Sequence, residues 1–198
     1  MSGPGPAPAA GRILVAGVGN IFLGDDGFGV ECVRRLAGHD LPEHVEVVDF
    51  GVRGVHLAYQ LLDGYRALVL VDATARGGAP GTVHLIEAAT PGEVEPGSPV
   101  LDGHRMGPDA VLALLDTLSA GTGGTPPRRV LVVGCEPQSL EEGIGLSEPV
   151  AAAVDEAVQL VLRLLRDEVW NAPAAAADRP AALVGDREQR RAPSCGRS

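Results

Sequence analysis

Short apolar segments alternate with amphipathic segments in the first part of the chain, and this alternation is the feature that most constrains the fold. Apolar runs of strand length occupy residues 13–16, 45–50 and 67–71. Between them, residues 26–37 and 53–62 space their apolar side chains as a helix packed by one face does. Strands joined by short connections through helices lie parallel, with helices covering the sheet. The sequence therefore predicts an α/β fold, a three-layer sandwich with a mostly parallel central sheet flanked by helices on both faces.

The rest of the domain departs from this alternation and then returns to it. Residues 82–86 directly follow a Gly/Pro turn, which predicts an antiparallel or edge strand. Residues 88–104 have no period and many Pro and Gly, which predicts an irregular loop. A helix starting at Pro108, a strand at 130–133 and a long helix at 147–166 are expected to complete the domain.

Length and composition indicate one folded domain between two tails. The chain has 198 residues, of which 45% are hydrophobic and 21% charged, as is usual for a globular protein with a sizeable core. We expect a flexible tail at 1–11, the folded domain at 12–168 and a disordered tail at 171–198, because both tails lack any period. Neither a signal-peptide pattern nor a membrane-length apolar run occurs, so we expect a cytoplasmic protein without membrane contact.

Charge and cysteine usage exclude several classes of function. The net charge of −10 argues against nucleic acid as a partner, because binding to phosphates requires a basic patch. An acidic body instead favours a cationic or metal-bearing partner. Three cysteines (Cys32, Cys135 and Cys195) are an odd number without metal-ligand spacing, so neither a disulfide framework nor a zinc site is predicted.

Acidic side chains follow the predicted strands where a parallel sheet binds its ligands. Asp25 and Asp26 lie after the first strand, hemmed by glycines, and Asp72 closes the third. The carboxyl ends of parallel strands share one edge of the sheet, so these carboxylates are expected to lie together. Acidic residues also satisfy free N–H groups at a helix start, and Asp72 could bond its own turn. A helix start accounts for one aspartate better than for two in a row.

Two carboxylates and one imidazole would suit a borderline divalent metal such as nickel or zinc. His104, at the end of the irregular loop, could fold over the edge that carries the aspartates, although an isolated loop histidine is more often solvated. A dinucleotide site is the rival interpretation, because Gly17-Val18-Gly19 follows a strand. That interpretation is weak, since Phe22 replaces the third glycine and acidic residues stand at the helix start.

A set of motifs resembles the [NiFe]-hydrogenase maturation proteases across roughly residues 12–166. The motifs are specific jointly rather than singly: Gly17-Val18-Gly19-Asn20, Asp25-Asp26-Gly27, Asp72, Gly103-His104, Pro80-Gly81-Thr82, and Glu136-Pro137-Gln138-Ser139-Leu140 with Gly143-Ile144-Gly145-Leu146-Ser147. The chain differs from many members after the second strand, where it has Phe50-Gly51-Val52-Arg53-Gly54 in place of Gly-Gly-Thr, and in its tail beyond residue 170.

The resemblance implies an endopeptidase that removes a short carboxy-terminal extension from the hydrogenase large-subunit precursor after nickel insertion. It also implies that Asp26, Asp72 and His104 bind the nickel, which is carried by the substrate and is not a permanent cofactor. No nucleotide is expected, the precursor is the partner, and the protein is expected to be a monomer.

The activation of water and two other functions remain open at this stage. The nickel ion could polarise the scissile carbonyl or activate water, or one aspartate could act as the general base. Two alternatives from other classes are a non-catalytic chaperone that checks nickel loading and a Rossmann-like small-molecule-binding module.

Overall fold

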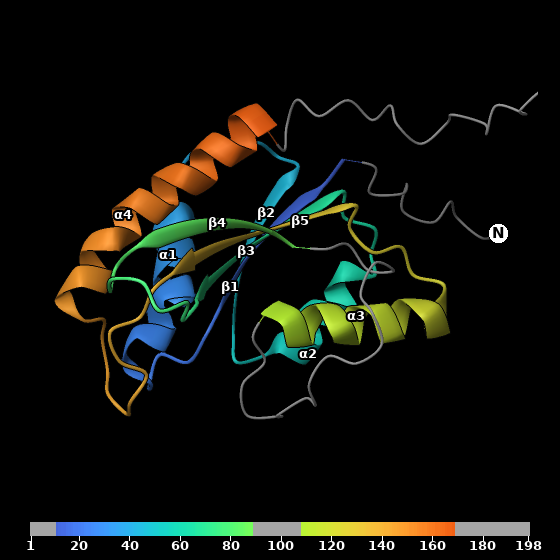
Figure 1. Cartoon of the computed structure of the whole chain (residues 1–198). Helices are drawn as coiled ribbons and strands as arrows, with labels where there is room; N and C mark the ends of the chain where they lie inside the picture. The colour runs from blue at the N-terminus through green and yellow to red at the C-terminus, as the bar shows by residue number, and fades with distance from the viewer. Residues whose placement is uncertain (1–10, 89–107, 169–198) are drawn as a thin grey trace, which may run out of the picture.

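The computed structural model describes residues 11–88 and 108–168 of the chain. Within them, five strands form one sheet with the order β2-β1-β3-β5-β4, and helices cover both faces (Figure 1). The strands are β1 Ile13–Val18, β2 Val45–Gly51, β3 Ala67–Ala73, β4 Val83–Ala88 and β5 Arg129–Cys135. The α-helices are α1 Phe28–Leu36, α2 Gly54–Leu61, α3 Pro108–Thr122 and α4 Glu148–Arg163, with short helices η1 Gly24–Gly27 and η2 Leu164–Glu168. This arrangement confirms the predicted α/β fold.

Four of the strands are parallel and the fifth is not. β1 pairs in parallel with β2 and β3, and β3 pairs in parallel with β5. β4 lies antiparallel to β5 at the edge of the sheet, so the strand after the Gly/Pro turn is both antiparallel and at an edge. The turn leaves no room for a crossover helix, and only an antiparallel strand can follow so short a connection.

The sheet separates two apolar layers, and the side-chain alternation of the strands divides residues between them. α1 and α4 cover one face, where Val69 and Val71 of β3 contribute to the core. α2 and α3 cover the other face, where Leu68 and Leu70 pack. Successive strand residues point to opposite faces, so a strand buried on both sides is apolar throughout. This explains why the central strands appear in the sequence as continuous apolar runs.

Several elements differ in length from the predictions. The strands predicted at 13–16 and 67–71 extend to Val18 and Ala73, which places Asp72 inside β3 and not after it. The helix predicted from residue 26 begins at Phe28, and Asp26 belongs instead to the short 3-10 helix η1. These stretches contain glycines and a polar residue, which interrupt the apolar pattern although the backbone hydrogen bonding continues. The apolar pattern therefore underestimated the length of the strands.

The apolar helix stripes are largely confirmed. Helical spacing of the apolar residues predicts the buried positions Val150, Val154, Ala157, Val158 and Val161 of α4 and Phe28, Val30, Cys32, Val33 and Leu36 of α1, and all of them are buried. Val55 of α2 is an exception, with 45% of its surface exposed. It lies in the first turn of α2 but off the stripe formed by the buried positions Gly54, Leu57 and Leu61.

The strand order fixes where a ligand site can form. From β1 the chain passes through α1 to β2 on one side, and from β2 it returns through α2 to β3 on the other side. The connections leave β1 and β3 in opposite directions, so a crevice opens at the carboxyl ends of these two strands. Asp26 follows β1, and Asp72 lies near the end of β3.

None of the helices within residues 11–88 and 108–168 combines the length and the apolar character needed to cross a bilayer. The predicted tails lie almost wholly outside the described residues. The division into tails and domain therefore stays a prediction.

Candidate active site

Asp26 reaches the crevice because a glycine-rich turn brings η1 close against the end of β1. The Asn20 N–H donates a hydrogen bond to Asp26 Oδ2 at 2.6 Å, which fixes the orientation of this carboxylate. Gly19 has a φ of 125°, and a Cβ at this position would overlap the backbone oxygen of Asp26. The sequence therefore needs a glycine here both for the backbone angle and for the close approach.

A second glycine brings the start of α1 against the sheet at the same place. A Cβ on Gly29 would overlap the backbone oxygens of Val18 in β1 and Val71 in β3. Helix α1 therefore approaches the strands more closely than any side chain would permit. This contact brings Asp26, which lies just before α1, close to Asp72, the residue that follows Val71 in β3.

Asp72 is a buried carboxylate, with 6% of its surface exposed. Burial raises the pKa of Asp72 well above its ordinary value, and the nearby Asp26 carboxylate raises it further, whereas a hydrogen bond from the backbone of Ala73 lowers it. A buried carboxylate whose pKa is raised by a neighbouring carboxylate is a candidate to bind a cation or a proton. The structure thus brings together the two aspartates predicted to act as a pair.

Asp25 binds a different segment of the chain and has a different role. It is 1% exposed and accepts four hydrogen bonds from the segment between β5 and α4. The donors are the Gln138 and Ser139 N–H groups (2.8 and 3.0 Å) and the Ser147 N–H and hydroxyl (2.6 and 2.9 Å). Burial raises the pKa of Asp25, but these hydrogen bonds outweigh it and hold the pKa below the ordinary value.

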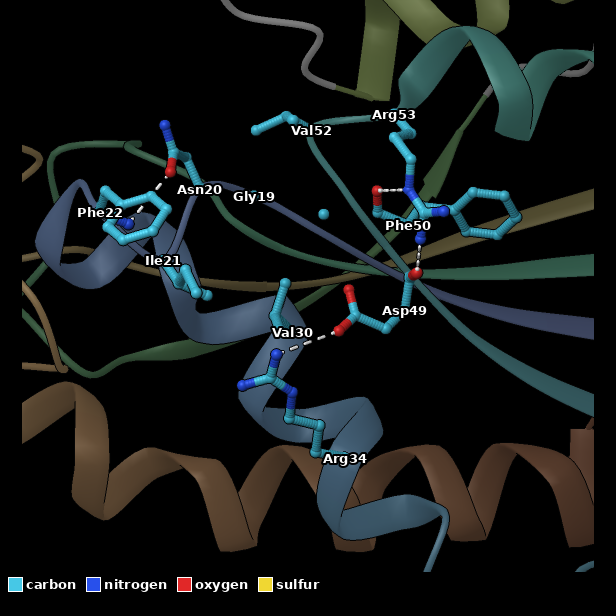
Figure 2. Close-up of a pocket in the computed structure, with 11 residues that line it drawn as sticks. Gly19, Asn20, Ile21, Phe22, Val30, Arg34, Asp49, Phe50, Val52 and Arg53 are labelled. Atoms are coloured by element: carbon cyan, nitrogen blue, oxygen red, sulfur yellow. Dashed lines mark hydrogen bonds and ion pairs between the residues drawn. The ribbon is translucent and has the colours of Figure 1, made fainter.

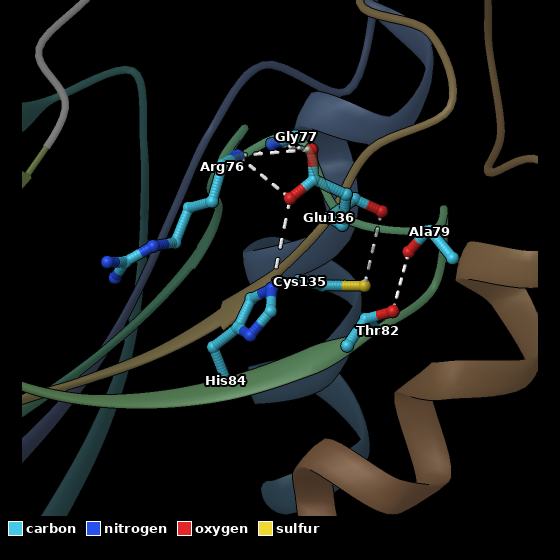
Figure 3. Close-up of polar contacts among 7 residues, drawn as sticks. All are labelled: Arg76, Gly77, Ala79, Thr82, His84, Cys135 and Glu136. Carbon is cyan, nitrogen blue, oxygen red and sulfur yellow. Dashed lines mark hydrogen bonds and ion pairs between the residues drawn. The ribbon is translucent and has the colours of Figure 1, made fainter.

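The segment after β3 is held by another buried carboxylate, that of Glu136 at the end of β5 (Figure 3). The Arg76 N–H donates to both carboxylate oxygens (3.0 and 2.8 Å), and the Gly77 N–H donates to Oε1 (3.0 Å). The Arg76 hydrogen bond is the main cause of the lowered pKa of Glu136. His84 Nε2 lies 3.8 Å from the same carboxylate. Glu136 therefore fixes the turn through which the chain leaves Asp72.

A pocket of about 230 Å³ opens beside Asp26, at the carboxyl ends of β1 and β2 (Figure 2). Gly19 and Asn20 line one wall, and Asp49, at the edge, forms an ion pair with Arg34 at 3.4 Å. Asp49 lies near the carboxyl end of β2, on the same edge of the sheet as Asp26, and lines this pocket. The volume is below the several hundred Å³ that small-molecule sites usually offer, which disfavours the dinucleotide interpretation.

His104 lies outside the described residues. Helix α3 begins four positions later, at Pro108, and the short segment 123–128 connects it to the start of β5. Figure 1 shows α3 running back along the sheet, with its last turn toward the amino end of β5. Its first turn therefore lies toward the edge that carries Asp26 and Asp72. Among the described residues, no three His, Cys, Asp or Glu side chains form a metal site by themselves.

The supporting roles of Asp25 and Glu136 were missed by the sequence prediction. Both residues stand in the motifs that carry the family resemblance, but spacing could not separate Asp25 from Asp26. The available signal was the pair of adjacent aspartates itself. The side chains of neighbouring residues in such a turn point in different directions, so Asp25 and Asp26 are expected to have different roles.

Comparison with known proteins agrees with this geometry. The family model HycI, hydrogenase maturation protease, matches residues 30–164. The Hydrogenase 2 maturation protease of Escherichia coli is 35% identical over 158 residues, which are 79% of this chain and 92% of that protein. A hydrogenase expression/formation protein HupD of Rhizobium leguminosarum is 34% identical over 166 residues, or 83% of this chain and 77% of the relative.

Solved structures agree as well. The hydrogenase maturating endopeptidase HybD of E. coli superposes with a TM-score of 0.61 at 34% identity, covering 78% of this chain and 92% of that one. A hydrogenase 2 maturation peptidase from a Thaumarchaeota archaeon gives 0.59 at 31% identity, covering 78% and 98%. The extent of these matches shows that the chain belongs to the hydrogenase maturation proteases, which are endopeptidases.

Proposed function

We propose that this protein removes the carboxy-terminal extension of a [NiFe]-hydrogenase large-subunit precursor once nickel has been inserted. Asp26, Asp72 and His104 bind the nickel ion, which arrives with the precursor. The observation that carries the proposal is the pairing of Asp26 and Asp72 at the β1/β3 crevice of a chain in this protease family.

The electrostatics of the pair support binding of a substrate-borne cation. The Asp26 carboxylate opposes the ionisation of Asp72, and Asp72 has little contact with water to offset this. A divalent ion would relieve the repulsion and favour both charged forms. Carboxylate and imidazole groups are suitable ligands for nickel. An unloaded precursor supplies no such ion and would bind this edge less well, which makes cleavage dependent on nickel loading.

The chain can contribute to hydrolysis in two ways within this site. By holding the nickel ion, the two aspartates would place the scissile carbonyl of the precursor where the ion polarises it. Alternatively, Asp72 acts as the general base toward water. Its pKa is raised well above the ordinary value, which makes its carboxylate a stronger base than that of an exposed aspartate.

Mass spectrometry of the precursor provides the test of the function. Nickel-loaded and nickel-free precursors are incubated with the protein, and the loss of a carboxy-terminal peptide from the loaded sample alone is expected. An unchanged mass with a bound, loaded precursor would instead indicate a chaperone that checks nickel without cutting.

Variants test the proposed ligands. Asp26→Asn, Asp72→Asn and His104→Ala should each abolish cleavage while circular dichroism shows a folded protein. Asp40→Asn, an exposed change in the connection between α1 and β2, is the matched control and should cleave normally. Folded variants that still cut would contradict the ligand assignment.

The remaining parts of the proposal concern the setting. We place the protein in the cytoplasm, where it acts as a monomer on the precursor without contact with nucleic acid or membrane. Size-exclusion chromatography with light scattering checks the monomeric state.

A further inference from the structure

We propose that the pocket at the carboxyl ends of β1 and β2 receives one apolar side chain of the precursor and thereby selects the substrate. This inference rests on the proposed function, because the precursor supplies the occupant. Among the described residues, the two proposed aspartate ligands, Asp26 and Asp72, do not line this pocket.

Apolar side chains from two separate segments surround the opening. Ile21 and Phe22 come from the turn after β1, and Val52 comes from the turn after β2 (Figure 2). Phe22 is 62% exposed and Val52 is 69% exposed, although both are large apolar residues. Single exposed apolar residues are ordinary, but several around one cavity mark a binding surface.

The charged groups at the pocket are already engaged, so the occupant is uncharged. Arg34 pairs with the carboxylate of Asp49. The guanidinium of Arg53 donates to the backbone oxygens of Phe50 (3.1 Å) and Asp49 (2.6 Å) and thereby folds back on its own turn. A charged occupant would have to compete with these contacts, whereas an apolar one buries the exposed side chains without disturbing them.

Size and position identify the occupant as a side chain of the substrate polypeptide. A volume of about 230 Å³ is below that of sites for whole small molecules and suits one side chain. Asn20 lines the pocket, and its N–H also donates to Asp26 Oδ2. The pocket therefore adjoins Asp26, within reach of a side chain of a polypeptide whose reacting bond lies there.

The test uses substitutions that leave the fold and the proposed ligands unchanged. Val52→Glu introduces a charge at the pocket, and Val52→Ala only removes apolar surface. Val55→Glu is the matched control, because Val55 is an exposed valine of the neighbouring helix α2 that does not line the pocket. Binding of the nickel-loaded precursor and its KM are measured for each variant. We expect Val52→Glu to weaken binding about tenfold or more, Val52→Ala to weaken it about threefold, and Val55→Glu to have no effect.

A second set of substitutions, in the precursor, identifies the occupant. Each apolar residue near the cut is replaced in turn by serine, and each precursor is tested with the wild-type protein and with Val52→Glu. One replacement should weaken binding to the wild-type protein but cause little further loss of binding to Val52→Glu. The reason is that the effects of substituting two residues in contact are not additive.

The outcomes separate the inference from the proposed function. If the wild type cleaves and Val52→Glu binds and cleaves equally well, the pocket assignment is wrong and the protease function stands. Full additivity for every serine replacement would also overturn it. If the wild type neither binds nor cuts the loaded precursor, the proposed function itself is wrong.

Discussion

Replacing Asp25 by asparagine tests whether this buried carboxylate holds the site together. The change keeps the shape of the side chain but exchanges one acceptor oxygen for an NH₂ group. Asp25 accepts four hydrogen bonds, three at Oδ2 and one at Oδ1. The amide can keep its oxygen at the position of three donors, and its NH₂ group then faces the Ser147 N–H.

The structure gives the size of the expected loss. A buried donor left without an acceptor costs about 1–3 kcal/mol, and hydrogen bonds to a charged group are each stronger than neutral ones by about 1 kcal/mol. Since Asp25 is 1% exposed, solvent cannot replace the lost acceptor. We expect Asp25→Asn to lower the free energy of unfolding by about 3 kcal/mol or more. This corresponds to a fall in Tm of roughly 6–12 °C for a protein of this length.

The effect has a defined pH dependence. The hydrogen bonds hold the pKa of Asp25 below its ordinary value of 3.8, so the stabilisation is fully present above that pH. It is lost as the pH falls through the lower pKa of the folded state, because the proton removes the charge. The difference in stability between wild type and Asp25→Asn should therefore be constant near neutral pH and shrink below pH 3.8.

Urea unfolding followed by circular dichroism at several pH values measures both the loss in the free energy of unfolding and its pH dependence. Asp155→Asn is the control, because Asp155 pairs with Arg35 through a side chain that is 83% exposed, where a salt bridge contributes little. A loss for Asp25→Asn no larger than that for Asp155→Asn, or a difference independent of pH, would refute the structural role of Asp25.

Two further predictions concern the packing that supports the site. In urea unfolding, Gly29→Ala should lower stability by about 3 kcal/mol or more, because the new Cβ overlaps backbone oxygens of β1 and β3. Gly121→Ala in α3 is the control: its Cβ enters open space and should raise stability by about 0.5–1 kcal/mol. Equal effects of the two substitutions would contradict the close packing at Gly29. In a Cys195→Ser background, which removes the cysteine outside the described residues, native protein should not react with a thiol reagent at pH 8, and urea should expose two thiols. Burial raises the pKa of Cys32 far above its ordinary value and that of Cys135 to about 12, so neither forms a thiolate at that pH; rapid labelling of the native state would contradict this.

The fold was predictable because its signals are local. A strand buried on both faces must be apolar at each position, and a helix packed on a sheet must be apolar along one stripe. The runs that became β1 and β3 and the α4 stripe satisfy these conditions without reference to any distant residue. Their ends were less certain, because backbone pairing continues through Gly17 and Asp72 where the apolar signal stops.

The candidate site was predictable in part. Parallel connections place the ends of β1 and β3 at one edge, so the closeness of Asp26 and Asp72 followed from order alone. The different role of Asp25 could not be predicted from the sequence, because its hydrogen-bond donors lie more than a hundred residues away along the chain. Likewise, no local pattern shows that Glu136 binds the turn after β3.

The sequence alone thus determined the class of fold, the edge at which the site lies and the aspartates that meet there, because periodicity and connection length act over a few residues. Only the tertiary structure decided the direction of each carboxylate, the burial that raises the pKa of Asp72, and the pocket between the turns after β1 and β2. These properties depend on which distant groups surround a side chain. Hydrogen bonding and exclusion of water arise from that packing and not from the residue's neighbours in the chain.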